Sequence, residues 1–98
     1  MIRDPRSPLK KPVGAVVSAI DILRCLGAAP GPLRLSDIVK ALKLNASTAL
    51  NILRTLEREG LVAAQGDSKR YGLAAGLLDL AAPLLDDVAA GRGLLPMM

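Results

Sequence analysis

The chain has 98 residues, 51% of them hydrophobic, which corresponds to one small domain and excludes a disordered polymer. It contains no Phe, no Trp and one Tyr, so we expect a core of Leu, Val, Ile and Ala. No stretch approaches the roughly 18 apolar residues that a membrane-spanning helix needs. A single cysteine, Cys25, cannot form an internal disulfide, which favours a reducing compartment. We therefore expect a cytoplasmic protein with no membrane partner.

The formal net charge of +4 is unevenly distributed along the chain. Residues 1–12 are rich in proline and basic groups and show no periodicity, so we expect a flexible basic arm. Residues 13–73 carry eight basic and five acidic groups, whereas residues 74–98 carry one basic and three acidic groups. The basic part suits a polyanionic partner, although a moderate basic excess is also common in soluble proteins without one.

A first helix is predicted over residues 14–28, before the helix-breaking cluster at residues 29–32. Apolar positions near helical spacing are expected to face the core: Val17, Ile20, Leu23, Cys25 and Leu26. A short extended segment, residues 33–35, should follow. Ser36 is then expected to cap a second helix that ends near Lys43, with Asp37 placed favourably against the helix dipole.

A third helix is predicted over residues 45–59, with Asn45 as its N-cap and Gly60 beyond its C-terminal end. Its apolar residues fall at the i, i+3, i+4, i+7 spacing of one helix face: Ala49, Ile52, Leu53 and Leu56. Only two or three residues separate this helix from the second. Two short helices joined so tightly are typical of a helix-turn-helix.

Two short strands are predicted at residues 61–65 and 69–73, and the turn chemistry of Gly66-Asp67-Ser68 lies between them. A β-hairpin directly after a helix-turn-helix is a wing. The sequence thus predicts a mainly α fold with a small β-hairpin. We expect residues 13–74 to form a winged helix-turn-helix, with a three-helix core plus the wing, followed by a linker helix.

The linker helix is predicted over residues 75–90. We expect the segment 75–98 to contain this helix and the start of an effector domain that is absent from this chain. Its apolar residues step by 4, 3 and 4 to form a seam: Leu77, Ala81, Leu84 and Val88. Pro83 removes a backbone donor and should kink or divide the helix. Two interpretations of the seam remain open, pairing of two chains in a homodimer or packing back onto the first helix.

The polar side of the third helix carries side chains suited to the DNA major groove: Ser47, Asn51, Arg54, Thr55 and Arg58. Asn can pair with adenine, Arg with guanine, and a hydroxyl with a phosphate or a base. Backbone amides near Ser36 are candidates for phosphate contacts, as are Lys69 and Arg70 beside the hairpin turn. The alternatives are that this polar side is merely solvated, or that the winged helix binds protein.

Enzyme chemistry is not expected. The chain has no His, no second Cys, no glycine-rich phosphate loop and no metal-ligand spacing, so neither a cofactor nor a metal is predicted. Asp86 and Asp87 are neighbours that diverge by about 100° on a helix, which makes them a poor acid–base pair.

Several segments resemble the N-terminal domain of IclR-type bacterial transcriptional regulators. They include Leu35-Ser36-Asp37-Ile38, Ser47-Thr48-Ala49 and Leu56-Glu57-Arg58-Glu59-Gly60-Leu61-Val62, followed by Arg70-Tyr71-Gly72-Leu73. The resemblance covers roughly residues 13–82. There are departures, because Lys43 stands where the family often has Gly, and Asn51 where it often has Arg.

The resemblance implies a repressor or activator that binds duplex DNA, usually as a dimer or tetramer on a palindromic operator. It implies that Ser47 and Thr48 open the recognition helix and that Arg70 is the basic residue of the wing. A small-molecule effector is implied only if a C-terminal sensor domain is present.

Overall fold

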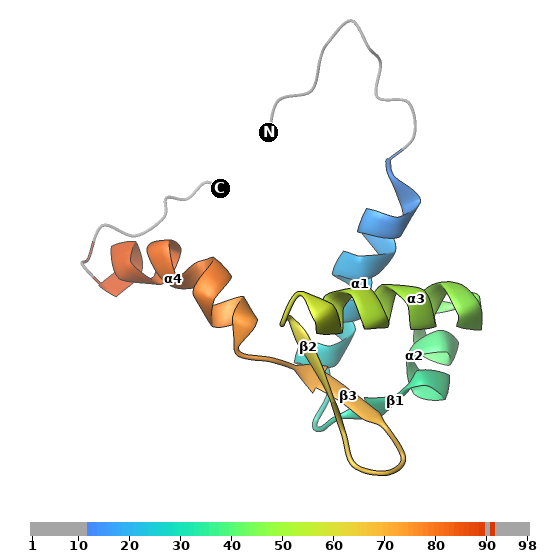
Figure 1. Cartoon of the computed structure of the whole chain (residues 1–98). Helices are drawn as coiled ribbons and strands as arrows, with labels where there is room; N and C mark the ends of the chain where they lie inside the picture. Colours follow the sequence, from blue (N-terminus) through green and yellow to red (C-terminus); the bar gives the residue numbers. More distant parts are fainter. Residues whose placement is uncertain (1–11, 90, 92–98) are drawn as a thin grey trace, which may run out of the picture.

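The computed structural model describes residues 12–89 and 91 and has the predicted winged-helix architecture (Figure 1). In chain order its elements are α1 (Gly14–Ala28), β1 (Leu33–Arg34), α2 (Leu35–Leu42), α3 (Ala46–Arg58), β2 (Val62–Gln65), β3 (Arg70–Leu73) and α4 (Gly76–Ala89). The predicted basic arm lies outside the described residues, apart from Pro12.

The wing is part of a three-stranded antiparallel sheet with the order β1-β3-β2. The hairpin of β2 and β3 was predicted, and the predicted extended segment at residues 33–35 contains β1, whose pairing with β3 was not predicted. In the pairing of β1 with β3, Leu33 lies opposite Tyr71 and Arg34 lies opposite Arg70. The sheet therefore joins the base of the wing to the start of α2.

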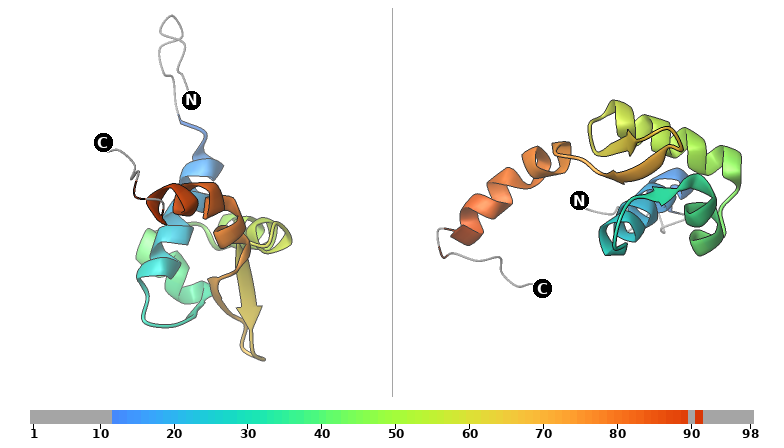
Figure 2. Two further views of the ribbon diagram at one scale, coloured as in Figure 1. Left: turned by 90° about the vertical axis from the view of Figure 1, so that its left-hand side faces the viewer. Right: turned by 90° about the horizontal axis from the view of Figure 1, so that it is seen from below.

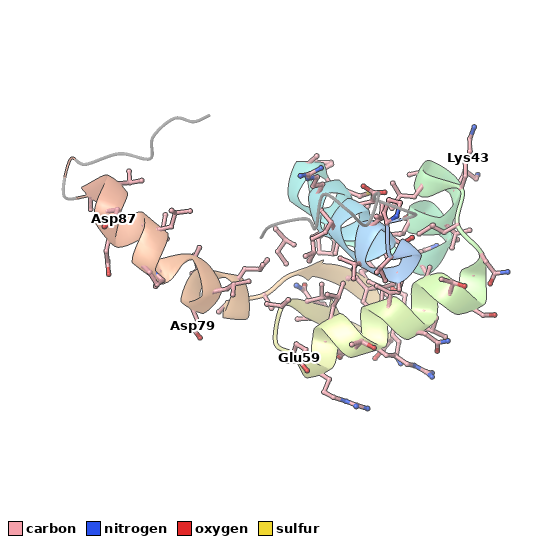
Figure 3. The ribbon with its side chains drawn as sticks, turned by 90° about the horizontal axis from the view of Figure 1, so that it is seen from above. Lys43, Glu59, Asp79 and Asp87 are labelled. Atoms are coloured by element: carbon pink, nitrogen blue, oxygen red, sulfur yellow. The ribbon has the colours of Figure 1, made fainter. Side chains whose placement is uncertain are left out.

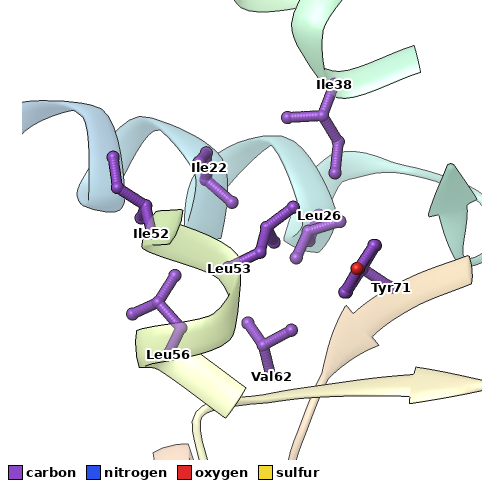
Figure 4. Close-up of a cluster of buried hydrophobic side chains, with 8 residues drawn as sticks. All are labelled: Ile22, Leu26, Ile38, Ile52, Leu53, Leu56, Val62 and Tyr71. Carbon is purple, nitrogen blue, oxygen red and sulfur yellow. The ribbon is translucent and has the colours of Figure 1, made fainter. Parts of the chain in front are cut away.

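The hydrophobic core lies where α1, α2, α3 and the sheet meet (Figure 4). Its largest fully buried side chains are Ile22, Ile38, Leu53 and Val62. The predicted inner face of α3 is confirmed, because its four apolar residues are all buried. Tyr71, the only aromatic residue, is also buried in this cluster.

The predicted inner face of α1 is partly wrong. Ile22 and Leu26 are its buried residues, whereas Val17 is 44% exposed and Ile20 is 41% exposed. The cause is that α1 carries two overlapping apolar stripes at helical spacing, so periodicity alone could not decide which one the core covers. Burying the stripe of Ile22 leaves the other stripe on the surface.

The predicted cap of α2 is also wrong. The helix begins at Leu35 with Arg34 as its N-cap residue, which places Ser36 inside the first turn. The Asp37 carboxylate accepts a hydrogen bond from the backbone N–H of Arg34 at 3.1 Å. An acidic side chain at the third helical position thus reaches back to the cap residue, as in one half of a capping box. The shift follows from β1, which runs directly into the helix.

The helix α4 projects away from the three-helix core (Figures 1 and 2) and has no buried residue. Its first turn is held by the backbone, because Gly76 N–H donates to the carbonyl of Gly60 at 3.0 Å. A Cβ atom on Gly76 would overlap that carbonyl, so glycine is required there. Pro83 lies inside the helix without dividing it. The predicted seam does not pack back onto α1: Leu84 is 49% and Val88 50% exposed.

None of the helices within residues 12–89 is both long enough and apolar enough to cross a membrane.

The packing of α3 yields a stability prediction. We expect Leu53→Ala to lower the free energy of unfolding by roughly 2–5 kcal/mol, because it leaves a cavity at a fully buried position. Leu80→Ala is the matched control, since Leu80 is 70% exposed on α4 and its loss should change stability by less than about 0.5 kcal/mol. Urea unfolding followed by circular dichroism measures both. Equal losses for the two variants would contradict the described core.

Candidate nucleic-acid interface

The orientation of α3 is fixed at its N-terminal end by the turn from α2. Lys43 adopts a left-handed conformation with φ of 55°, and the N–H of Leu44 donates to the carbonyl of Val39 at 3.1 Å. Asn45 then caps α3 as predicted: its side-chain oxygen accepts from the N–H of Ser47 at 2.8 Å and from that of Thr48 at 3.2 Å. The first turn of the helix is therefore fixed relative to α2.

Four predicted contact residues, all exposed, form the polar face of α3: Ser47, Asn51, Arg54 and Arg58. At about 100° per residue they fall within an arc of about 60°, opposite the buried apolar face. Since the apolar face is held in the core, the polar face points to solvent along the length of the helix. The four side chains therefore project from the same side of the helix, as DNA contact residues in one groove need to do.

The two threonines of α3 lie beside the polar face and are also exposed. The Thr55 hydroxyl donates to the carbonyl of Asn51 at 2.9 Å, one turn earlier. Its proton is thus used within the helix, and only its lone pairs remain to accept a bond from a ligand.

The wing turn presents the other predicted cations. Gly66 and Lys69 both have positive φ, of 75° and 49°, and the N–H of Lys69 donates to the carbonyl of Gly66 at 3.1 Å. Gly66 suits such a conformation, whereas Lys69 takes it up despite its Cβ atom. Lys69 and Arg70 are both exposed at the end of the hairpin.

An open groove of about 470 Å³ separates α3 from the wing. It brings together three of the predicted contact residues, Ser36, Arg54 and Lys69, from three different elements. The remaining predicted residues lie outside its lining. The groove also contains Arg34, which is not among the predicted contact residues. The available signal was its position immediately before α2, but its approach to the wing depends on the pairing of β1 with β3.

Acidic side chains lie on several elements, among them Glu57 and Glu59 at the end of α3 and Asp67 in the wing turn. Within residues 12–89, none of Arg34, Arg54 and Lys69 forms an ion pair. Asp79 and Asp87 lie on α4, away from α2 and α3 (Figure 3). Because Arg34, Arg54 and Lys69 form no ion pair with a described residue, they are available to an external anion.

Comparison with protein families matches residues 15–66 to the IclR helix-turn-helix domain. Those residues contain the first three helices, the first two strands and the start of the wing turn.

Comparison with characterised sequences finds two glycerol operon regulatory proteins. The protein of Streptomyces coelicolor is 46% identical over 68 residues, which are 69% of this chain and 27% of the relative. The protein of Streptomyces griseus is 44% identical over the same number of residues and the same shares of the two chains. The alignments thus span little more than a quarter of these relatives.

Among solved structures, a transcriptional regulator from Alicyclobacillus acidocaldarius superposes with a TM-score of 0.73 and is 36% identical. The superposition covers 82% of this chain and 33% of that one. The similarity again falls on one part of a longer protein.

The cap of α3 gives a testable prediction. We expect Asn45→Ala to lower the free energy of unfolding by about 1 kcal/mol, because the N–H groups of Ser47 and Thr48 lose their acceptor. Asn45→Ser retains a capping oxygen and should cost only a small part of that amount. Urea unfolding compares the two variants, and an equal loss for both would show that the cap bonds do not stabilise the helix.

Proposed function

Because this chain belongs to the family of IclR helix-turn-helix domains, we propose that it binds duplex DNA sequence-specifically and regulates transcription. The helix α3 enters the major groove in this proposal. The observation that carries it is the polar face, whose four side chains project together from a helix fixed at its N-terminal end and along its buried side.

The chemistry of the polar face suits base edges. Asn51 can donate to N7 of adenine and accept from its N6 amino group. Arg54 can donate to both N7 and O6 of guanine. Ser47, near the start of the helix, and Arg58, near its end, are placed for contacts at the two sides of the groove. Lys69 and Arg70 contact the sugar–phosphate backbone beside it. No catalytic step is part of the proposal.

In this proposal the chain has two functional parts. Residues 13–74 form the DNA-binding unit, and the helix that follows connects it to a partner subunit. The exposed cations around α3 favour DNA over a protein ligand on this side of the molecule.

The base-reading role is tested with the 98-residue chain. An operator is first selected from random duplexes, and Asn51→Ala and Arg54→Ala are then compared on the selected duplex and on random DNA. Each substitution is expected to cost about 1–3 kcal/mol on the selected duplex and to relax base preference, because a bidentate contact is lost. Fluorescence anisotropy at fixed salt measures the affinities.

The matched control is Arg24→Ala, which removes an exposed arginine from α1 rather than from α3. It should leave the preference unchanged. Equal losses on selected and random DNA for Arg54→Ala would contradict its base-reading role. Failure of the wild-type chain to enrich any duplex would favour a protein-binding winged helix instead.

We further propose that two chains pair through the seam of α4 and bind a palindromic operator. The support is that Leu84 and Val88 of the seam are exposed while Leu77 and Ala81 are half-buried, and aliphatic side chains on a projecting helix are costly to expose. A twofold dimer would present two copies of α3 to two half-sites of the duplex.

Two neighbouring alanines test this pairing with the same substitution. Ala81 lies on the seam, whereas Ala82 lies about 100° away and is exposed. We expect Ala81→Glu to prevent dimer formation, because it places a charge in the apolar contact, and Ala82→Glu to leave the dimer intact. Sedimentation velocity measures the species present. A wild-type chain that remains monomeric at high micromolar concentration would exclude the pairing.

A further inference from the structure

Arg34 occupies a position in the sheet where its charge is unfavourable for folding. It lies directly opposite Arg70 in the pairing of β1 with β3, and both side chains are exposed. Like charges on directly opposite residues destabilise a sheet. No residue in the described ranges 12–89 and 91 neutralises Arg34 through an ion pair. The nearby Asp37 carboxylate is turned to the backbone N–H of Arg34 and does not line the groove.

The groove beside Arg34 has two chemically different parts. Leu35, Leu50 and Tyr71 supply apolar surface, and the cations of Arg34, Arg54 and Lys69 lie around it. An apolar patch bounded by cations fits a ligand that has both an apolar body and a negative charge. The deoxyribose–phosphate unit of a DNA strand has both parts, whereas inorganic phosphate has only the charge.

The position of the groove relative to α3 favours the same ligand. Leu50 and Arg54 lie one helical turn apart, with Arg54 at the edge of the polar face and Leu50 just beyond it. When α3 occupies a major groove, the strand bordering that groove lies beside the helix, where the wing is also found. A backbone segment can therefore enter between α3 and the wing without displacing the base contacts.

We propose that this groove seats one sugar–phosphate segment of bound DNA, with Arg34 as a phosphate-binding residue that acts together with Lys69. The proposal rests on the DNA-binding function proposed above and assigns to Arg34 a role separate from base reading. Lys69 holds one side of the phosphate from the wing, Arg34 holds the other from the end of β1, and the apolar surface contacts the sugar.

The test measures how DNA affinity depends on salt. Arg34→Gln is expected to reduce the steepness of log K against log salt by about 0.9, the contribution of one phosphate contact. Between 50 and 200 mM salt, wild-type affinity should thus fall roughly three- to fourfold more than that of the variant. The loss should be alike on selected and random duplexes. Arg34→Lys should restore the salt dependence. The matched control is Arg24→Gln, which removes an exposed arginine from α1.

A second measurement separates the strand from a free anion. Single phosphates of the selected duplex are replaced by neutral methylphosphonates, and one position should weaken wild-type binding but not further weaken Arg34→Gln. If Arg34→Gln behaves as Arg24→Gln does while the wild type binds DNA, the proposal is overturned and the DNA-binding function stands. The same conclusion follows if inorganic phosphate shifts the amide signals of the groove and no methylphosphonate position depends on Arg34. A wild type that binds no duplex overturns both.

Discussion

The burial of one face of α3 is the constraint on which the rest of this domain depends. Ala49, Ile52, Leu53 and Leu56 are buried where α3 packs against α1, α2 and the sheet, and this packing determines which side of α3 meets solvent. Rotation of the helix by one residue, about 100°, would bring polar side chains into the core and remove leucines from it. The direction of the polar face is therefore a consequence of core packing, and it needs no interaction of its own.

Core packing sets the rotation of α3 about its axis, and hydrogen bonds at its two ends fix its position relative to the neighbouring elements. Asn45 fixes the first turn, and the left-handed Lys43 sets the path from α2. At the other end Gly60, with φ of 80°, reverses the chain and accepts a hydrogen bond from Gly76 at the start of α4. The same short segment thus anchors both α3 and α4. A change in the direction of α4 would therefore act on the end of α3 through two glycines rather than through side chains.

The parts of the fold that could be predicted are those in which local pattern and long-range packing coincide. The cap of α3, its buried face and the hairpin follow from short-range signals, so their prediction is confirmed. Ser36 as a cap was wrong, and the strand pairing of the extended segment before it was not predicted, because the pairing of β1 with β3 joins distant residues. The same pairing is the reason why Arg34 was not predicted as a contact residue, because only the folded sheet brings it to the wing.

The error on α1 has a different origin, and it bears on assembly. A helix with one apolar stripe allows one choice of inner face, whereas α1 has two stripes, and the fold buries only that of Ile22 and Leu26. The other stripe, with Val17 and Ile20, remains partly exposed, as does the seam of α4. A sequence that retains more aliphatic surface than its own core can cover is typical of a chain that associates. The proposed dimer accounts for the exposed seam of α4, and the stripe of Val17 and Ile20 on α1 lies outside it.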